Sequence, residues 1–151
     1  MDAGERSQRE KVVAEARRWR GTPYHDCQRV RGVGVDCAQL PAAVYAAAGV
    51  IPEIPIFPYS PQWHLHQTEE RYLNLVLQHA REFAGPPLPG DFVLIKVGHC
   101  HAHGAIVVDW PRIIHAVSGQ GVIVADASRD PFARKLPIDR EPRFFTLWGD
   151  G

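Results

Sequence analysis

The chain has 151 residues, of which 45% are hydrophobic and 23% charged, and its 17 basic side chains balance 17 acidic ones. This length fits one domain over residues 1–151, and the neutral balance argues against a nucleic-acid binder held by a basic surface. No apolar run approaches the roughly eighteen residues of a membrane span, and the first residues lack the apolar core of a signal peptide. We therefore expect no nucleic-acid partner, no membrane insertion and cytoplasmic synthesis.

The first helical pattern lies at the start of the chain. Ser7 and Glu10 have the spacing of a capping box, and the apolar residues that follow recur on one helical face. These features predict a helix over 7–20, which Gly21 ends. The segment 24–35 that follows carries two glycines and is expected to be a loop.

Two further helices are expected in the middle of the chain. The pattern predicts one over 36–48, with Asp36 as its N-cap, and another over 68–83, which Gly85 and the prolines after it stop. Between them, a proline at every third residue over 52–61 indicates an extended connector.

After Gly90 the pattern becomes strand-like. Short β-branched or aromatic runs predict strands over 92–97, 104–109, 112–117, 122–126 and 143–148, and tight turns separate several of them. Helices followed by closely connected strands indicate an α+β domain with an antiparallel sheet of about five to six strands.

Cys37 is the first candidate for chemistry, because it directly follows the expected N-cap of a helix. Unpaired N–H groups and the positive end of the helix dipole favour a thiolate at such a position. The thiolate is the nucleophilic form, so we expect an activated cysteine whose neighbouring N–H groups contribute to an oxyanion hole.

Two histidines strengthen this interpretation. His103 opens one predicted strand and His115 lies within the next, twelve residues further on. On paired antiparallel strands their side chains meet on one face. A base beside a thiol, with a third group that orients the base, is the arrangement of activated nucleophiles.

Several ordered motifs resemble the NlpC family of cell-wall cysteine peptidases. They are Gly21-Thr22-Pro23-Tyr24, Val35-Asp36-Cys37-x-x-Leu40, Leu88-Pro89-Gly90-Asp91, His103-Gly104-x-Ile106 and Ile114-His115-Ala116. The stretches Ser60-Pro61-Gln62-Trp63 and Ser118-Gly119-x-Gly121-Val122 are similar to the phage-tail branch of that family. The resemblance covers roughly residues 12–148.

This resemblance implies a papain-like α+β fold, without a cofactor, that hydrolyses amide bonds in peptidoglycan stem peptides beside D-glutamate and a diamino acid. By position, Cys37 is the nucleophile, His103 the general base and His115 the residue that orients His103. Tyr24 matches a tyrosine beside the nucleophile, with a role at the oxyanion, and Asp36 an acidic residue that shapes the substrate pocket. Phage members act at the cell wall from the virion tail, which implies phage tail proteins as partners.

Two residues depart from the family pattern. Family members read Asp-Cys-Ser-Gly or Asp-Cys-x-Gly-Leu, whereas this chain has Ala38 and Gln39 in those places. The change removes a polar contact to the substrate and puts a side chain where the backbone approaches closely. It motivates a second hypothesis, a non-catalytic tail assembly protein with a vestigial site. A third is acyl transfer or amide hydrolysis on a substrate outside the cell wall.

A zinc-binding domain is a further alternative. His99, His101 and His103 alternate along one segment, so a strand would place them on one face. A fourth ligand would come from His64 or His66. This hypothesis and the peptidase hypothesis compete for His103.

Overall fold

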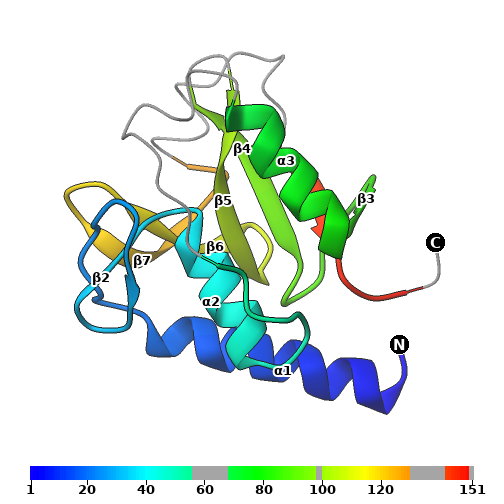
Figure 1. Cartoon of the computed structure of the whole chain (residues 1–151). Helices are drawn as coiled ribbons and strands as arrows, with labels where there is room; N and C mark the ends of the chain where they lie inside the picture. Colours follow the sequence, from blue (N-terminus) through cyan, green and yellow to red (C-terminus); the bar gives the residue numbers. More distant parts are fainter. Residues whose placement is uncertain (56–67, 98–99, 130–141, 150–151) are drawn as a thin grey trace.

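A computed structural model of the chain describes residues 1–55, 68–97, 100–129 and 142–149 (Figure 1). The helices are α1 (Ala3–Arg18), α2 (Gln39–Ala47) and α3 (Thr68–His79). The strands are β1 (Arg29–Val30), β2 (Gly34–Val35), β3 (Arg81–Phe83), β4 (Phe92–Val97), β5 (Cys100–Asp109), β6 (Arg112–Val117), β7 (Gly121–Asp126) and β8 (Arg143–Thr146). The α+β class predicted from the sequence is confirmed.

The main sheet is six-stranded, antiparallel at every pairing, and has the order β3-β8-β4-β5-β6-β7. Strands β4 to β7 follow the chain as a meander, whereas β8 inserts between β3 and β4. The prediction of about five to six strands is confirmed, and β4 and β6 have the predicted bounds. Helices α1 and α2 lie together against one side of this sheet (Figure 1).

The first helix begins earlier than the capping-box spacing predicts. Asp2 is its N-cap, and the carboxylate accepts a hydrogen bond of 2.7 Å from the N–H of Glu5. Ser7 therefore lies inside α1, and its predicted role as the cap is wrong. The physical reason is that Asp2 already satisfies the first turn, so that helical residues upstream of Ser7 are stabilised.

The third helix is shorter than predicted, because α3 ends at His79 and Arg81–Phe83 forms β3. This strand pairs with β8 through Arg81–Thr146 and Phe83–Phe144. The conformation of β3 depends on a pairing partner more than sixty residues away in the sequence. The local helical pattern therefore cannot predict this strand. The expected loop over 24–35 also contains a short hairpin of β1 and β2.

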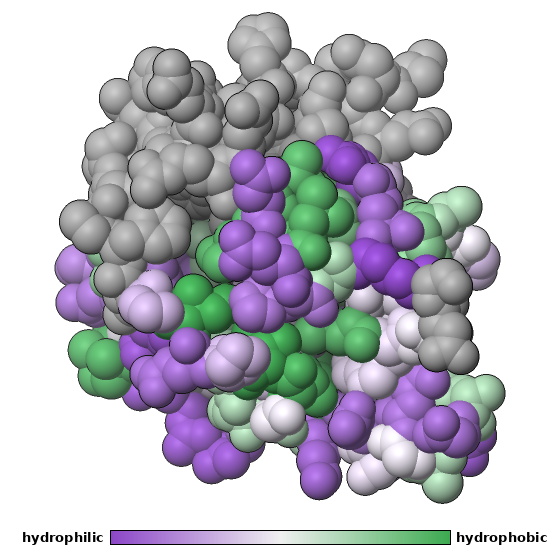
Figure 2. Space-filling view, turned by 45° about the vertical axis from the view of Figure 1, so that its right-hand side comes forward, coloured by the Kyte–Doolittle hydropathy of each residue, from purple (hydrophilic) through white to green (hydrophobic). Residues whose placement is uncertain are grey.

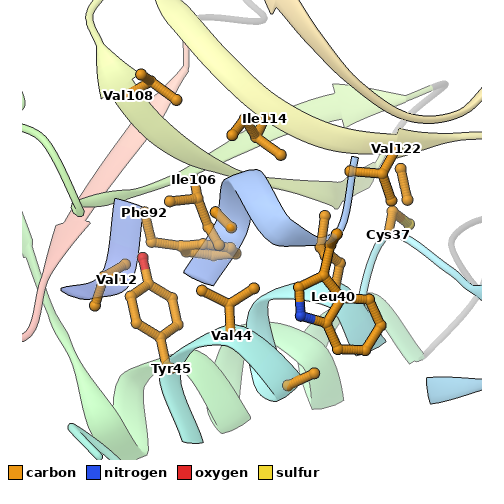
Figure 3. Packing of buried hydrophobic residues seen from close by; sticks show 14 of the residues in the cluster. Val12, Cys37, Leu40, Val44, Tyr45, Phe92, Ile106, Val108, Ile114 and Val122 are labelled. Carbon is orange, nitrogen blue, oxygen red and sulfur yellow. The ribbon is translucent and has the colours of Figure 1, made fainter. Parts of the chain in front are cut away.

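The main core lies between the helices and the sheet (Figure 3). Val12, Leu40 and Val44 from the helices pack with Ile106 and Ile114 from the sheet, and each is 0% exposed. Cys37 belongs to the edge of this same cluster, where Val122 of β7 also lies (Figure 3). The candidate nucleophile is therefore anchored in the core.

A buried ion pair ties α1 to the beginning of the sheet. Arg9 donates to Asp91 Oδ1 over 2.9 Å and to the carbonyl of Pro89 over 3.0 Å, and its guanidinium stacks 4.3 Å above the Trp148 ring. The other oxygen of Asp91 accepts from the N–H of Leu88. This network fixes the end of the loop that leads into β4.

Candidate active site

The segment that carries Cys37 is held by the buried carboxylate of Asp36. Asp36 is 0% exposed, and its Oδ1 accepts from the N–H groups of Ala38 at 3.0 Å and Gln39 at 2.8 Å. Its Oδ2 accepts from the N–H of Cys27 at 2.8 Å. One side chain thus fixes the turn around Cys37 and joins it to the preceding loop.

The prediction that Asp36 is the N-cap of the second helix is wrong, because the N-cap lies two residues later. Helix α2 begins at Gln39, and its N-cap is Ala38, whose side chain makes no capping hydrogen bond. A turn closed by the hydrogen bond from Leu40 N–H to the Asp36 carbonyl lies before the helix. Asp36 still accepts hydrogen bonds from N–H groups near the start of the helix, as the side chain of an N-cap does. For this reason the sequence around Asp36 resembles that of an N-cap.

The Cys37 thiol lies between the first loop and the sheet. It is 8% exposed, and it interacts with the Tyr24 hydroxyl, with its own backbone N–H and with the N–H of Gly104. Gly104 directly follows His103 on β5. The structure therefore brings the candidate nucleophile to the strand that carries the candidate base, as the sequence predicted.

The expectation of a thiolate stabilised by a helix dipole is wrong for this structure. Burial and the neighbouring Asp36 carboxylate raise the pKa of Cys37 to about 12, although the hydrogen bonds from Tyr24, Cys37 and Gly104 act in the opposite direction. Helix α2 starts two residues later, and a negative charge lies beside the sulfur. Cys37 is accordingly a thiol at neutral pH until a base removes its proton.

His103 and His115 contact one another directly. Nε2 of His103 lies 2.7 Å from Nδ1 of His115, and the two rings are nearly perpendicular at 88°. The register of β5 and β6, in which Ile106 faces Ile114, makes the two histidines diagonal neighbours. The predicted meeting of these side chains is confirmed.

The two histidines differ in their environments. His115 is 2% exposed, whereas His103 is half-buried. Burial, together with the charge of His103, lowers the pKa of His115 to about 3. His115 therefore stays neutral at physiological pH and offers a nitrogen lone pair or an N–H to His103 without competing for its proton.

Tyr24 is placed beside the nucleophile by backbone pairing with Val35, two residues before Cys37. Its hydroxyl hydrogen-bonds to the Cys37 thiol, and burial together with the nearby acidic groups raises the pKa of Tyr24 well above its ordinary value. The phenol remains a protonated donor at any physiological pH, as a group that stabilises developing negative charge must be.

Two features of the site escaped the sequence interpretation. Thr22, 1% exposed, accepts from the N–H of Gly32 through its hydroxyl and from the N–H of Val122 through its carbonyl, so it fixes the loop before Tyr24 to β7. Gln39 accepts two hydrogen bonds from Arg29. Thr22 in a Gly-Thr-Pro turn and Gln39 near a helix start are polar residues that the sequence could have indicated as structural. Their hydrogen-bond partners, however, are not adjacent to them in the sequence.

Most of the histidines of the predicted zinc site lie outside the residues that the structure describes. His64, His66 and His99 fall outside the described residues, and the side chain of His101 is not described. Among the residues that are described, no group of three or more His, Cys, Asp or Glu side chains is placed to hold a metal ion. Over the same residues, no helix has the length and apolar character needed to cross a membrane.

The fold is the papain-like α+β fold of NlpC/p60 domains, as its similarity to solved structures shows. The NlpC/p60 domain of the peptidoglycan hydrolase SagA superposes with a TM-score of 0.60 at 21% identity, over 91% of this chain and 96% of that one. NlpC1 from Trichomonas vaginalis gives 0.61 at 17% identity, over 87% of this chain and 42% of that one.

A third similar structure is RipD from Mycobacterium tuberculosis, described as a non-catalytic NlpC/p60 domain protein adapted to peptidoglycan binding. It has a TM-score of 0.55 at 16% identity, over 93% of this chain and 98% of that one. No protein-family model and no curated protein sequence matches the chain. The chain therefore has the NlpC/p60 fold, with a low sequence identity to these structural neighbours.

Proposed function

We propose that the chain is an NlpC-type cysteine peptidase that hydrolyses amide bonds in peptidoglycan stem peptides, between D-glutamate and a diamino acid. The observation that carries the proposal is the contact of His103 with His115 on the strand whose Gly104 N–H meets the Cys37 thiol. The residues proposed as nucleophile, base and orienting group thus come together from two halves of the chain, which supports the proposal.

The proposed chemistry is acyl transfer in two steps. With Nε2 of His103 bound to His115, the other ring nitrogen, Nδ1, serves Cys37. His103 takes the thiol proton as sulfur attacks the amide carbonyl, and then protonates the departing amine. Water that loses a proton to His103 next releases the acyl group as a carboxylic acid and restores the thiol.

The N–H groups of Cys37 and Gly104 support charge stabilisation in this scheme. Both interact with the sulfur, as does the Tyr24 hydroxyl, so three donors lie next to the atom that attacks, where the carbonyl oxygen of a bound substrate would also come close. Preorganised donors of this kind contribute a factor of roughly 10²–10³ each to turnover. Since the pKa of Cys37 is raised, the proposed reaction requires His103 to take the thiol proton.

Purified peptidoglycan is the direct test. Wild-type protein should release shortened stem peptides with a new amine, detected by mass analysis of the muropeptides, whereas Cys37→Ala should release none. His103→Ala should lose a factor of about 10²–10⁴ in turnover, typical of a general base. Cys27→Ser, which keeps the proposed nucleophile, is the matched control. Equal turnover by wild type and Cys37→Ala would refute the peptidase.

A non-catalytic peptidoglycan-binding domain is the second candidate. The buried Cys37 with its raised pKa favours it, and so does the similarity to RipD, a protein described as non-catalytic. Co-sedimentation with peptidoglycan separates the two. Binding by wild type without any new amine supports this candidate, whereas cleavage that depends on Cys37 excludes it.

The association with a phage or prophage tail rests on the sequence motifs around Trp63 and Gly121. We propose that the protein is made in the cytoplasm and carried to the cell wall on the tail. Induction of the producing strain, purification of particles on a density gradient and mass spectrometry of tail fractions test this. Absence of the protein from intact particles would reject the association.

A further inference from the structure

The Tyr24 hydroxyl differs from the other donors to the Cys37 sulfur. The N–H groups of Cys37 and Gly104 belong to the backbone, whereas the hydroxyl lies at the end of a side chain, so its position depends on how residues 21–25 are held. The apolar hollow between α2 and α3, in the middle of the face shown in Figure 2, has Ala38 in its described lining but none of these residues. Residues 21–25 are instead held by hydrogen bonds to two other segments.

Residues 21–25 form a strap, which is bonded on one side to β7. The N–H of Gly21 donates to the carbonyl of Val122 at 3.0 Å, and the N–H of Val122 donates to the carbonyl of Thr22 at 2.9 Å. Since β7 is an edge strand of the main sheet, the strap continues the sheet by one short segment at this edge. The first half of the strap is thus fixed to the sheet that carries both candidate histidines.

The second half of the strap is bonded to β2. The N–H of Val35 donates to the carbonyl of Pro23, and the N–H of His25 donates to the carbonyl of Val35, both at 3.0 Å. These two bonds flank Tyr24, and Val35 lies two residues before Cys37. A displacement of β2 therefore moves the backbone on both sides of Tyr24.

The Thr22 side chain joins the strap to the far end of the β1–β2 hairpin. Its hydroxyl oxygen accepts from the N–H of Gly32 at 2.9 Å, and Thr22 is 1% exposed. Gly32 lies in the turn between β1 and β2, so this bond holds the hairpin turn to the strap. A valine fills nearly the same space as a threonine but cannot accept the bond.

We propose that Thr22 is a positioning residue, which holds the β1–β2 hairpin to the strap and thereby keeps the Tyr24 hydroxyl on the Cys37 sulfur. The bond to Gly32 restrains the end of the hairpin that is remote from the strap bonds to Val35. Without this bond the hairpin can swing about Val35, and such a motion carries Tyr24 away from the thiol. This inference rests on the proposed function, in which Tyr24 stabilises developing negative charge.

Alkylation of Cys37 tests the proposal without any turnover. In a Cys27→Ser, Cys100→Ser background at pH 9, Tyr24→Phe should slow the reaction with iodoacetamide about 10-fold, because the hydroxyl bond favours the thiolate. Thr22→Val should slow it by at least about threefold, whereas Thr22→Ser, which keeps the hydroxyl, should react like the background. Mere loosening of the site would instead uncover Cys37, which is 8% exposed, and speed the reaction.

A double-mutant cycle shows whether Thr22 acts through Tyr24. Adding Thr22→Val to Tyr24→Phe should slow alkylation by less than about twofold, since the hydroxyl that Thr22 positions is already gone. Arg31→Gln, which changes the exposed neighbour of Gly32, is the matched control and should react like the background. Thermal denaturation checks that each variant is folded at the assay temperature, and Thr22→Ala takes the place of Thr22→Val if that variant does not fold. Independent effects in the double variant, or an unchanged or faster rate in Thr22→Val, overturn the proposal.

Failure of the proposed function gives a different result. On peptidoglycan, Thr22→Val should lower kcat at least about 10-fold with little change in KM, because Tyr24 acts on the reacting atoms. If the alkylation rates behave as proposed but the protein with Cys37 cleaves nothing, the positioning role stands and the peptidase is wrong. If cleavage depends on Cys37 but Thr22→Val keeps the wild-type kcat and alkylation rate, the peptidase stands and the positioning role is wrong.

Discussion

Nε2 of His103 and Nδ1 of His115 are 2.7 Å apart. At this distance one of the two nitrogens carries a hydrogen and donates it, and the other nitrogen accepts it. Burial keeps His115 neutral, because the pKa of its ring is lowered to about 3. Its Nδ1 accepts the hydrogen when His103 carries it on Nε2. In that tautomer Nδ1 of His103 has the lone pair that a general base needs.

The buried, neutral state of His115 makes stability depend on pH. In the unfolded chain a histidine titrates near 6.5, whereas in the fold the pKa of His115 is about 3, so the unfolded state binds more protons between these values. The free energy of unfolding should fall as pH drops from about 6.5 to about 3, by up to about 1.4 kcal/mol per pH unit from this group.

Urea unfolding at pH 7, 5 and 4 measures this effect. His115→Gln, which cannot gain a proton, should show a pH slope that is smaller by about one proton than that of wild type. The difference between the slopes cancels the contributions of the carboxylates that the two proteins share. Equal slopes would show that His115 titrates alike in the folded and unfolded chains.

The raised pKa of Cys37 predicts slow alkylation at neutral pH. In a Cys27→Ser, Cys100→Ser background, the rate with iodoacetamide should rise about tenfold per pH unit from pH 7 to 10 without a plateau, because only the thiolate reacts and the pKa lies near 12. Alkylation increases the mass of the protein, and the absence of this increase when Cys37→Ala is added to the same background identifies Cys37 as the labelled residue. A plateau below pH 8 would contradict the prediction.

Gly121 and Gly119 offer a matched pair of substitutions at the β6–β7 turn. Both have positive φ, +80° and +84°, but a Cβ on Gly121 would lie 2.6 Å from the Thr22 carbonyl oxygen, whereas one on Gly119 has no atom within 4 Å. Gly119→Ala should cost about 1 kcal/mol of backbone strain. Gly121→Ala should cost at least about 3 kcal/mol and reduce turnover, because it displaces Thr22 and hence Tyr24.

Thermal denaturation and peptidoglycan cleavage measured on the two glycine variants decide the point. Equal losses of stability would mean that the close approach of β7 to Thr22 is unimportant. Retained turnover in a destabilised Gly121→Ala protein would mean that this approach supports the fold without positioning Tyr24.

Asp91 and Asp109 distinguish a buried ion pair from an exposed one. The side chain of Asp91 is 2% exposed and pairs with Arg9, whereas Asp109 is 68% exposed and pairs with Arg112 at 2.7 Å. Asp91→Ala should lower the free energy of unfolding by about 2–3 kcal/mol, since it removes one of the two carboxylates that pair with the buried Arg9 and the acceptor of the Leu88 N–H. Asp109→Ala should change it by less than about 1 kcal/mol. Chemical denaturation of both variants is the measurement, and similar losses would contradict it.

The sequence predicted the parts of the fold that depend on local pattern and on register. The strands β4 and β6 have their predicted bounds, and His103 meets His115, because alternation fixes which side chains share a face of paired strands. Arg81–Phe83 could not be predicted as a strand, since its conformation comes from pairing with distant β8. A helical continuation was the reasonable local alternative.

The candidate site was only partly predictable for a related reason. Adjacency of Asp36 and Cys37 indicated a capped turn, but the pKa of the thiol depends on burial and on the distance to that carboxylate, which are properties of packing. The contacts of Thr22 with β7 and of Gln39 with Arg29 likewise join residues through the folded loop. Sequence spacing identified Asp36 and Cys37 as parts of one turn without giving these contacts or the pKa of the thiol.

The position of β8 has a consequence for biosynthesis. Residues 143–146 fill the place between β3 and β4, so a nascent chain that has emerged only as far as β7 has Cys37 and both histidines but a sheet divided by a missing strand. The six-stranded sheet is complete only when residues 143–146 have left the ribosome. The order of the sheet thus makes the pairing of β3 and β4 depend on a strand that is synthesised after both of them.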